Sequence, residues 1–508
     1  MNKTFQKRMC VILAMLLLVT LLLPGCTSIL TDQQTTTAAE ISSETAPEPT
    51  EPIERDTILR VAIPTSTNNI TFVDLTDHIN QWVRVFEATH RNVDVVIESA
   101  MAEERLQTEL MAGKGPDVIL SPTTTTFYIL NSQNEVGSIP ISDVNLAMQN
   151  GIFYDISAFY DADEELNKDA LEPAVMDAGV VDGKRFVLPL RYNLLVAYVD
   201  MDRFEKTGLG TEIFEKDITY FWDSLTEYGN PYLASSAVIR SQFDSELNLI
   251  GELIDYDNQE VLLTQDVLVD YLQSKQNFLI TRGETEVSLQ ALLHEYYAPG
   301  MDAAFANSGW MNVMNPKTML VGGVDLAIHN AVIAESQGIN LGMYPLRSTD
   351  GSVTADITFY GAVTRGSENP ELAYEFLRYF LTEESQWEEN VRFAMKDIEG
   401  ASLMVPGWPV RVKGSADAIH THLKGWTWNI QLRDGKIDNL ADAVTYTDED
   451  LPILNVMIDQ ARFPTGLERT FRSLTASVYN VHTGEQLYDL ESAAADFIEE
   501  LEWHVGEG

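Results

Sequence analysis

Two short segments of this 508-residue sequence carry residue types that could bind a metal ion. His420 and His422 are separated by one residue and could supply two imidazole ligands, which is half of a zinc site. Residues 161–165 contain four carboxylates, as in oxygen-rich calcium loops, but the central glycine of an EF-hand is absent. We therefore expect a solvated acidic loop, and neither a bound metal nor another cofactor.

Sequence motifs for covalent or metal-assisted catalysis are missing. The chain has no Gly-x-Ser-x-Gly elbow, no phosphate-binding loop and no His-Glu-x-x-His motif. Pairs of carboxylates, which a glycosidase requires, are abundant because the chain has 77 Asp and Glu residues, and no pair stands out. We expect binding without covalent chemistry, so the protein is predicted not to be an enzyme.

The N-terminus has the order of a bacterial secretion signal. Three basic residues lie among the first eight, and Met9–Leu23 is almost wholly apolar. This stretch is shorter than the roughly 20 residues of a membrane-spanning helix, so residues 1–25 are predicted to be a signal peptide. Its end, Leu23–Cys26, looks like a lipobox in which Cys26 receives lipid. Whether cleaved or kept as an anchor, this segment predicts a chain on the outer face of the cytoplasmic membrane.

Composition restricts the possible partners. The formal charge is −44, and without the three basic residues of the signal it is 30 minus 77, or −47. Nucleic acid is excluded as a partner because phosphate binding needs basic patches. Cys10 and Cys26 are the only cysteines, so the exported body has no thiol for a disulfide. Residues 26–56, rich in Thr, Ser, Glu and Pro, are predicted to be a disordered tether before a monomeric body.

Strands and helices alternate in the first part of the body. Apolar periodicity and turn residues predict strands at 58–63, 93–97 and 118–120, and helices at 74–89 and 103–111. This order indicates α/β units around a mainly parallel sheet. From Tyr446 onward the pattern is mostly helical, and we predict no later strand.

Several blocks of sequence resemble one protein family. They resemble family 1 extracellular solute-binding proteins, the sugar-type receptors related to maltose-binding protein. The resemblance covers roughly Ile58 to Glu384 and is weak over residues 390–448. The blocks, in the order of that family, are Leu106–Ile119, Asp182–Leu190, Val196–Leu209, Phe221–Leu225 and Ser367–Gln386.

The resemblance implies an α/β fold of two lobes, of the class II periplasmic-binding-protein type, with a ligand cleft between the lobes. Lobe 1 would comprise residues 57–190 and 355–412, and lobe 2 residues 191–354 and 413–508. The chain would cross between the lobes near Pro189–Leu194, Leu346–Thr358 and Val410–Ala416. Such lobes close around a ligand by hinge motion.

The same resemblance implies which residues line the cleft. The polar candidates follow the ends of strands or lie at the first crossing. For those after the third strand, the alternative is that they form a polar loop that caps the next helix. Relatives often carry a sugar-stacking tryptophan near Ile328–Asn330, and this chain has none there. Trp408, Trp426 and Trp428 could form a ligand platform or pack in the core. The predicted ligand-binding residues are Ser121, Thr123, Thr124, Arg191, Tyr192, Asn193, Trp310, His329, Asn330 and Phe471.

The resemblance implies a lipid-anchored receptor that captures a small polar solute, a sugar or oligosaccharide, and delivers it to an ABC permease in the membrane. Aromatic faces and oriented polar side chains in a closed cleft would supply the affinity. Three alternatives stay open: a surface sensor or adhesion lipoprotein on the same fold, a receptor for peptides or other solutes, and an enzyme that turns over a bound glycan.

Overall fold

The structure is a computed structural model. It describes residues 55–63, 73–99, 103–123, 141, 143–229, 244–283, 319–324, 327, 330, 331, 334, 338–383, 385, 386, 407–411, 427–431, 437–441, 453, 456–479 and 485–506. The predicted signal peptide, the lipid attachment residue Cys26 and all but the last two residues of the tether lie outside these ranges. Among the helices that the structure does describe, none is long and apolar enough to cross a membrane.

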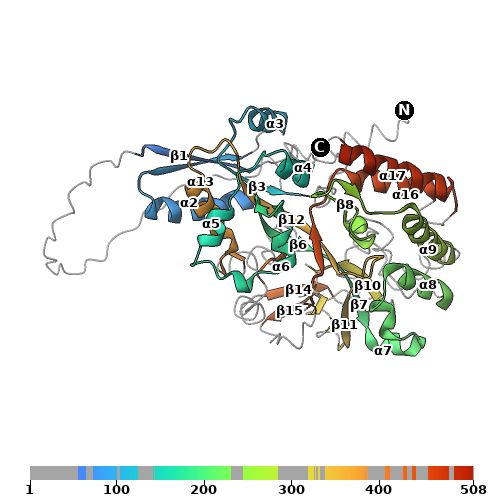
Figure 1. The fold of residues 1–508 in the computed structure, drawn as a ribbon. Coiled ribbons are helices and arrows are strands. Elements are labelled where there is room, and N and C mark those ends of the chain that lie inside the picture. The colour runs from blue at the N-terminus through green and yellow to red at the C-terminus, as the bar shows by residue number, and fades with distance from the viewer. Residues whose placement is uncertain are drawn as a thin grey trace, which may run out of the picture. The chain divides into compact units, whose positions relative to one another are not determined.

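The larger sheet contains seven strands, which are β1 (Thr57–Ile63), β2 (Val93–Ser99), β3 (Val118–Pro122), β6 (Val187–Asn193), β12 (Thr354–Val363), β13 (Trp408–Pro409) and β16 (Gln460–Arg462). Their order is β13-β6-β12-β3-β1-β2, and β16 pairs with the start of β12 (Figure 1). β2 and β3 run parallel to β1, whereas β12 runs antiparallel to β3 and β6. Every residue of β12 is buried, so β12 forms the middle of this sheet.

Helices join the strands of this sheet and pack on it. On α2 (Val73–Thr89), the Trp82 ring stacks on Tyr379 with centroids 3.7 Å apart, and Phe86 meets Phe376 edge-on. Phe376 lies on α13 (Pro370–Arg378), so α2 and α13 cover the same region of the sheet. We call this sheet and its helices the seven-stranded half. Its other helices are α3 (Glu103–Met111), α4 (Val144–Gln149), α5 (Ser157–Ala162) and α6 (Pro173–Asp177), and its hairpin is β4 (Val180–Val181) with β5 (Lys184–Arg185).

A second, antiparallel sheet has the order β10-β7-β11. Its strands are β7 (Leu195–Asp200), β10 (Met319–Gly323) and β11 (Leu341–Pro345). Side chains of β7 alternate between the two hydrophobic cores: Val196 and Tyr198 belong to the core of the seven-stranded half, and Ala197 and Val199 to a second core. That second core includes residues of α8 (Ile218–Tyr228), α9 (Gln265–Gly283), α16 (Leu467–Val478) and α17 (Leu490–Gly506), which lie side by side in Figure 1.

We call this second sheet and its helices the three-stranded half. It also includes α7 (Met201–Phe204) and the hairpin of β8 (Ile254–Asp255) with β9 (Glu260–Val261). A separate hairpin pairs β14 (Thr427–Gln431) with β15 (Ile437–Ala441). The α/β architecture with two sheets confirms the fold class that the sequence predicts.

Three passages connect the two halves. The first is Leu194, between β6 and β7, and the second is residues 346–353, between β11 and β12. The third lies at residues 464–466, because Phe463 belongs to the core of the seven-stranded half and Leu467 to the second core. This passage comes later in the chain than the expected crossing near Val410–Ala416, since Ile453, Ile458 and Phe463 return to the first core. The lobe boundaries drawn from the sequence otherwise stay a prediction.

The predicted strands and helices of the first part are confirmed with small differences at their ends. Helix α3 has the predicted bounds, and the third strand extends by two residues, through Ser121 and Pro122. The prediction of no strand after Tyr446 is wrong, because Gln460–Arg462 forms β16. Its single apolar residue, Ala461, gave no strand pattern, and its pairing with β12 creates the strand.

Candidate functional site

Ser121 and Thr123 lie at the carboxyl end of β3, and both are buried. The Thr123 hydroxyl donates to the carbonyl of Ile357 on β12, and its backbone N–H donates to the carbonyl of Thr358 at 3.1 Å. The Ser121 hydroxyl donates to the carbonyl of Pro122 at 2.9 Å. Both hydroxyls therefore bond backbone within the sheet, and their contact with a ligand stays a prediction. Thr124 lies outside the described residues.

Arg191 is a buried cation on β6. Its guanidinium donates to two carbonyl oxygens, from Nη1 to Gly407 at 3.1 Å and from Nη2 to Gln386 at 3.4 Å. No carboxylate among the described residues forms an ion pair with it, and burial lowers the pKa of Arg191 to about 9. Buried charges in proteins are normally paired, so Arg191 is unusual among the described side chains, and its contact with a ligand stays a prediction.

Tyr192 is buried on β6, opposite Trp408 on β13. Burial, with a smaller contribution from the charge of Glu172, raises the pKa of the Tyr192 phenol well above its ordinary value. The phenol therefore stays protonated at any physiological pH. Trp408 is also buried, which favours the core-packing alternative for this tryptophan, and Trp426 lies outside the described residues.

Asn193 ends β6 directly before the first passage, and Asn330 follows β10 in the chain. The Asn193 side-chain oxygen accepts the backbone N–H of Leu194 at 3.0 Å and of Val324 at 2.9 Å, so it joins β6 to the end of β10. Asn330 lies six residues after Val324, and its side chain is 1% exposed. Both its amide nitrogen and its amide oxygen are buried without a hydrogen-bond partner. Leaving both unpaired costs several kcal/mol in sum, so this amide has unused bonding capacity.

Phe471, one of the predicted aromatic ligand residues, packs in the second core and not at this passage. Phe471 is 1% exposed on α16 and contacts the rings of Tyr271 and Phe497 in the second core, with centroids 6.4 and 5.3 Å away. Trp310 and His329 lie outside the described residues. The structure thus brings Arg191, Tyr192 and Asn193 together with Gly407 and the end of β10, and it separates Phe471 from them.

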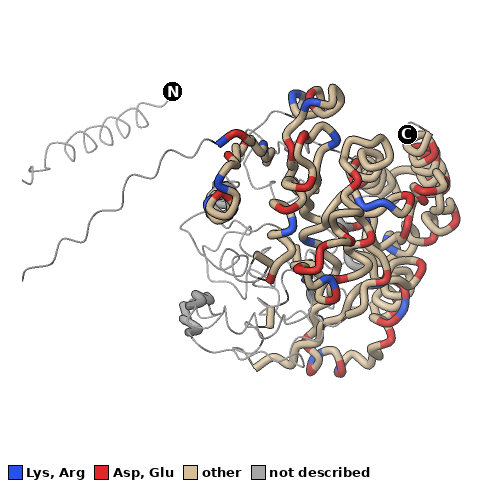
Figure 2. The backbone as a smooth tube through the Cα atoms, turned by 60° about the vertical axis from the view of Figure 1, so that its left-hand side comes forward, with Lys and Arg blue, Asp and Glu red and all other residues tan. Residues whose placement is uncertain are grey.

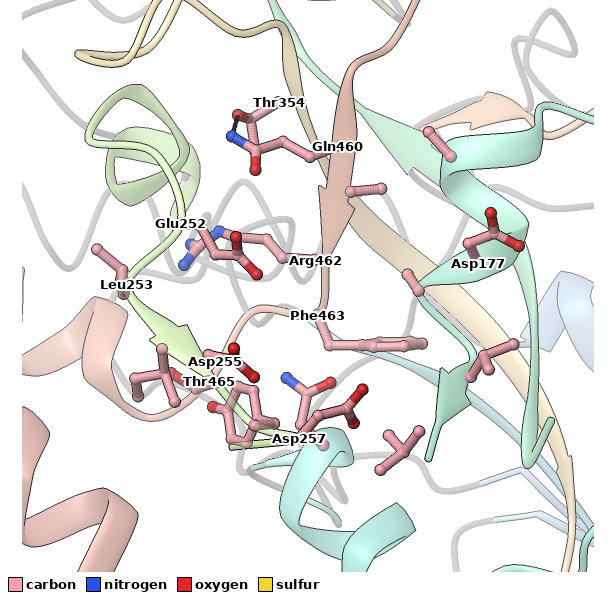
Figure 3. Close-up of a pocket in the computed structure, with 18 of the residues that line it drawn as sticks. Asp177, Glu252, Leu253, Asp255, Asp257, Thr354, Gln460, Arg462, Phe463 and Thr465 are labelled. Atoms are coloured by element: carbon pink, nitrogen blue, oxygen red, sulfur yellow. Dashed lines mark hydrogen bonds between the residues drawn. The ribbon is translucent and has the colours of Figure 1, made fainter. Parts of the chain in front are cut away.

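A pocket of about 380 Å³ lies between the two halves (Figure 3). Of the predicted ligand-binding residues that the structure describes, none lines it. Arg462 of β16 and Glu252, which precedes β8, are among its lining residues and are labelled in Figure 3. Its remaining carboxylates come from both halves: Asp177, Asp255, Asp257 and Asp459.

At the third passage, Arg462 sits between two buried carboxylates. Its Nε donates to Asp356 Oδ1 on β12 at 3.1 Å, and its Nη2 donates to Glu468 Oε1 on α16 at 2.6 Å. Asn248, which precedes the β8–β9 hairpin, donates to the other Asp356 oxygen at 3.4 Å. Burial, together with the charge of Asp356, raises the pKa of Glu468 to about 7, although Arg462 opposes the rise. We call Asp356, Arg462 and Glu468 the passage triad.

Polar side chains bond the second passage to β16, which precedes the third passage. Asp350 accepts hydrogen bonds from the Ser348 hydroxyl at 2.6 Å and from Gln460 Nε2 at 3.3 Å. Gln460 also donates to the Thr354 hydroxyl at 3.0 Å, a bond that Figure 3 shows. Polar side chains therefore hold the second passage and the start of β12 to β16.

Sequence reasoning missed the passage triad. Its members are spread over three elements, and Asp356 and Arg462 are 106 residues apart in the chain. One signal was available: Phe463–Thr465 is a Pro-containing turn before a helix whose second residue is Glu468, as at a helix start. In this turn the Thr465 N–H donates to Glu468 Oε2 at 2.6 Å.

The acidic segment 161–165 also has a structural role. Asp163 accepts hydrogen bonds from the Tyr374 hydroxyl at 2.9 Å and from Arg378 Nη1 at 3.0 Å, and so anchors α13. These contacts outweigh burial and lower the pKa of Asp163. Within the described ranges no group of three or more His, Cys, Asp or Glu side chains could hold a metal ion, and His420 and His422 lie outside them.

Comparison with known proteins gives similar folds at low identity. The chain is similar to a family 1 extracellular solute-binding protein from Alicyclobacillus acidocaldarius, with 14% identity over 88% of this chain and 98% of that chain, at a TM-score of 0.48. It is also similar to a sugar transporter protein from Rhizobium etli in an open conformation, with 13% identity over 87% of this chain and 99% of that chain, at a TM-score of 0.49. A third similar structure is a periplasmic oligogalacturonide-binding protein from Yersinia enterocolitica, with 13% identity over 89% of this chain and 99% of that chain, at a TM-score of 0.48.

Two de novo designed esterases are also among the similar structures, each with 14% identity and a TM-score of 0.49. No family model and no curated protein matches the sequence.

Proposed function

We propose that this protein is a solute-binding lipoprotein that captures a small polar ligand, a sugar or oligosaccharide, and delivers it to an ABC permease. Two hydrophobic cores, in two halves joined by three short passages, carry this proposal. Such halves can rotate about their passages and enclose a ligand, which is the hinge closure of binding proteins. Binding needs no covalent step, so the protein is proposed to act as a receptor and not as an enzyme.

The sequence supports the same function independently. The blocks Leu106–Ile119, Asp182–Leu190 and Ser367–Gln386 resemble family 1 extracellular solute-binding proteins and fall on elements of the seven-stranded half. The N-terminal signal with Cys26 supports a lipid anchor on the outer face of the cytoplasmic membrane. The body then works as a monomer beside its permease.

The polar groups of the first passage support a ligand rich in hydroxyl groups. Asn330 offers an amide donor and an amide acceptor that no described residue uses. Arg191 offers a cation whose partners among the described residues are carbonyl oxygens, and guanidinium groups bind oxygen ligands well. Sugars present donors and acceptors that such groups can pair, and a few oriented polar groups fix a small ligand in a protein site.

A thermal-shift screen of the purified protein against sugars, oligosaccharides, polyols, amino acids and short peptides tests this function. A ligand at 100 times its Kd stabilises the folded state by about 2.7 kcal/mol, which is readily measured. We expect a concentration-dependent rise with a sugar class. A rise with peptides alone would replace the sugar proposal, and no rise with any class would favour a sensor or adhesion role.

Site variants make the screen specific. Asn330→Ala is expected to abolish the ligand-dependent shift while leaving the unliganded protein as stable as before or more stable, because it removes unpaired polar atoms. Asn258→Ala, at an exposed position beside β9, is the matched control and should keep the full shift. An unchanged shift in Asn330→Ala would remove this residue from the site.

A further inference from the structure

One carboxylate binds both halves of the molecule. Asp143 precedes α4 in the seven-stranded half, and its Oδ1 accepts the backbone N–H of Leu146 at 2.9 Å as a helix cap. Its Oδ2 accepts from two residues of the three-stranded half. These are His504 on α17, with Nε2 at 2.6 Å, and Tyr256 in the β8–β9 hairpin, with its hydroxyl at 3.2 Å.

This contact is partly shielded from water. The side chain of Asp143 is 8% exposed and that of His504 is 16% exposed, so salt and water screen the pair less than a surface ion pair. Burial, and after it the charge of Asp143, raises the pKa of Tyr256 well above its ordinary value. Tyr256 therefore stays a neutral donor, and the group in this contact that can change charge near neutral pH is His504.

The same two halves touch at further points around this contact. Gln149 at the end of α4 donates from its side chain to the carbonyl of Tyr256. The backbone N–H of Asp182, in the β4–β5 hairpin, donates to Asp257 Oδ1 at 3.2 Å. The Asp143–His504 pair is thus the charged member of a small contact area between the halves, and that area lies apart from the three passages in sequence.

Other charged residues lie on α17 and on the elements that pack against it. The helix carries no Lys or Arg, and Glu500 lies one turn before His504. Lys275 on α9 is paired with Glu246, and Glu468 on α16 with Arg462. The other charged residues on elements that pack against α17 are Glu260, Asp266, Asp270, Arg282, Arg469 and Arg472.

We propose that Asp143 and His504 form a proton-operated latch between the two halves: when His504 is protonated the latch holds the arrangement described here, and when it is neutral the halves separate more easily. The inference rests on the proposed function, since it concerns the same two halves whose closure would enclose the solute. It assigns the solute-binding protein a response to external pH that acts on the equilibrium of its halves.

The direction of the response follows from linkage. Histidine ordinarily titrates near pH 6.5, and a carboxylate at hydrogen-bond distance favours the protonated ring. The latched arrangement therefore binds the proton more tightly than the unlatched one. The latch is fully present below about pH 6.5, the ordinary histidine pKa. It is lost as the pH rises through the higher pKa that the histidine has in the latched arrangement. Each pH unit by which the histidine pKa differs between the two arrangements corresponds to a tenfold change in the ratio of latched to unlatched molecules.

The distance between the halves can be measured with two spin labels. We would use the full-length protein with Cys10→Ser and Cys26→Ser, so that introduced cysteines are its only thiols. Labels at Glu368→Cys, exposed in the seven-stranded half, and Asp223→Cys, exposed in the three-stranded half, report their separation. Without solute, we expect one distance at pH 5.5 and a second, populated distance at pH 8.5.

Variants connect that change to the latch. His504→Gln and Asp143→Asn should both give the pH 8.5 distribution at pH 5.5; Asp143→Asn retains the oxygen that caps α4. His90→Gln is the matched control, because His90 pairs with Glu375 at 3.2 Å inside the seven-stranded half, and it should respond to pH like the parent. A distribution that does not change with pH, or that changes equally in His504→Gln, would overturn the latch. Because no solute is present, this outcome is independent of whether the protein binds sugar.

Discussion

Arg462 on β16 donates to Glu468 on α16 at 2.6 Å, across the passage through which the chain leaves the seven-stranded half for the last time. The same guanidinium bonds Asp356 at 3.1 Å, on the long central strand β12. Asp356 is 1% exposed and Glu468 is 6% exposed, so two carboxylates share one cation in a place with little water. The packing around the third passage therefore depends on a charge balance that pH and mutation can disturb.

We expect the free energy of unfolding to fall as the pH rises from about 4.5 to 7 because of Glu468. Its pKa is raised from 4.5 to about 7 in the folded protein. In this window the unfolded chain loses the proton first, so the folded state binds more protons and is favoured at the lower pH. A shift of this size corresponds to about 3 kcal/mol. Urea denaturation at pH 5 and pH 8 would measure the difference between the two stabilities.

Glu468→Gln isolates this contribution from the many other carboxylates of the chain. The variant cannot titrate at this position, so its stability difference between pH 5 and pH 8 should be smaller than that of the parent by about 3 kcal/mol. Glu499→Gln, at an exposed position on α17, should leave the difference unchanged. Equal differences in Glu468→Gln and the parent would show that Glu468 titrates at its ordinary value.

Removing the cation of the triad should destabilise the protein strongly. Arg462→Leu leaves Asp356 and Glu468 buried without their counter-ion, and breaking a buried pair in this way costs about 3–5 kcal/mol. Arg105→Leu is the matched control, because the Arg105 side chain is 61% exposed and pairs with Glu109 on the surface of α3. That loss should be under about 1 kcal/mol. Similar losses for the two variants in urea denaturation would contradict the importance of the triad.

The first part of the fold could be predicted from local patterns. Helix α3 and strands β1 to β3 have strong apolar periodicity and clear turn residues, and their predicted bounds agree with the structure to within a few residues. β16 could not be predicted, because three residues with one apolar side chain carry no period. Its strand form comes from pairing with Thr354–Asp356, which are more than 100 residues earlier in the chain.

The candidate site was only partly accessible to sequence reasoning. The adjacency of Arg191 and Asn193 to the first passage follows from their position at the end of a predicted strand, and the structure places both there. The resemblance also suggested Phe471, which packs in the second core, because helical spacing alone does not show which way an aromatic side chain points. The Asp143–His504 pair joins residues 361 positions apart, and no local pattern signals such a contact.

The distribution of charge does not show where the site lies. Figure 2 shows that acidic residues are spread over most of the described elements.

Gly407 should tolerate no side chain. Its φ is +107°, and a Cβ there would lie 2.2 Å from the Thr358 hydroxyl and 2.6 Å from the carbonyl oxygen of Tyr192. Gly407→Ala is therefore expected to disrupt the pairing of β13 with β6 and to cost about 2 kcal/mol or more. Gly466→Ala is the control, since its φ is −62° and its Cβ would meet no atom within 4 Å. That change should be neutral or slightly stabilising, and thermal denaturation would separate the two results.

Arg191 allows a test that separates binding from stability. An isolated buried charge is costly, so Arg191→Met, which keeps an unbranched apolar stem and removes the charge, should leave the free energy of unfolding unchanged within about 1 kcal/mol or raise it. If the guanidinium contacts the solute, the same variant should weaken solute binding at least tenfold in calorimetric titration. Arg185→Met is the contrasting variant, because the Arg185 guanidinium lies 4.3 Å from the centroid of the Tyr160 ring and bonds the carbonyl of Met176. It should lose stability and keep the parent affinity. A stable Arg191→Met protein with unchanged affinity would remove Arg191 from the binding site, and a large loss of stability would show that its bonds to Gly407 and Gln386 hold β6 to its neighbours.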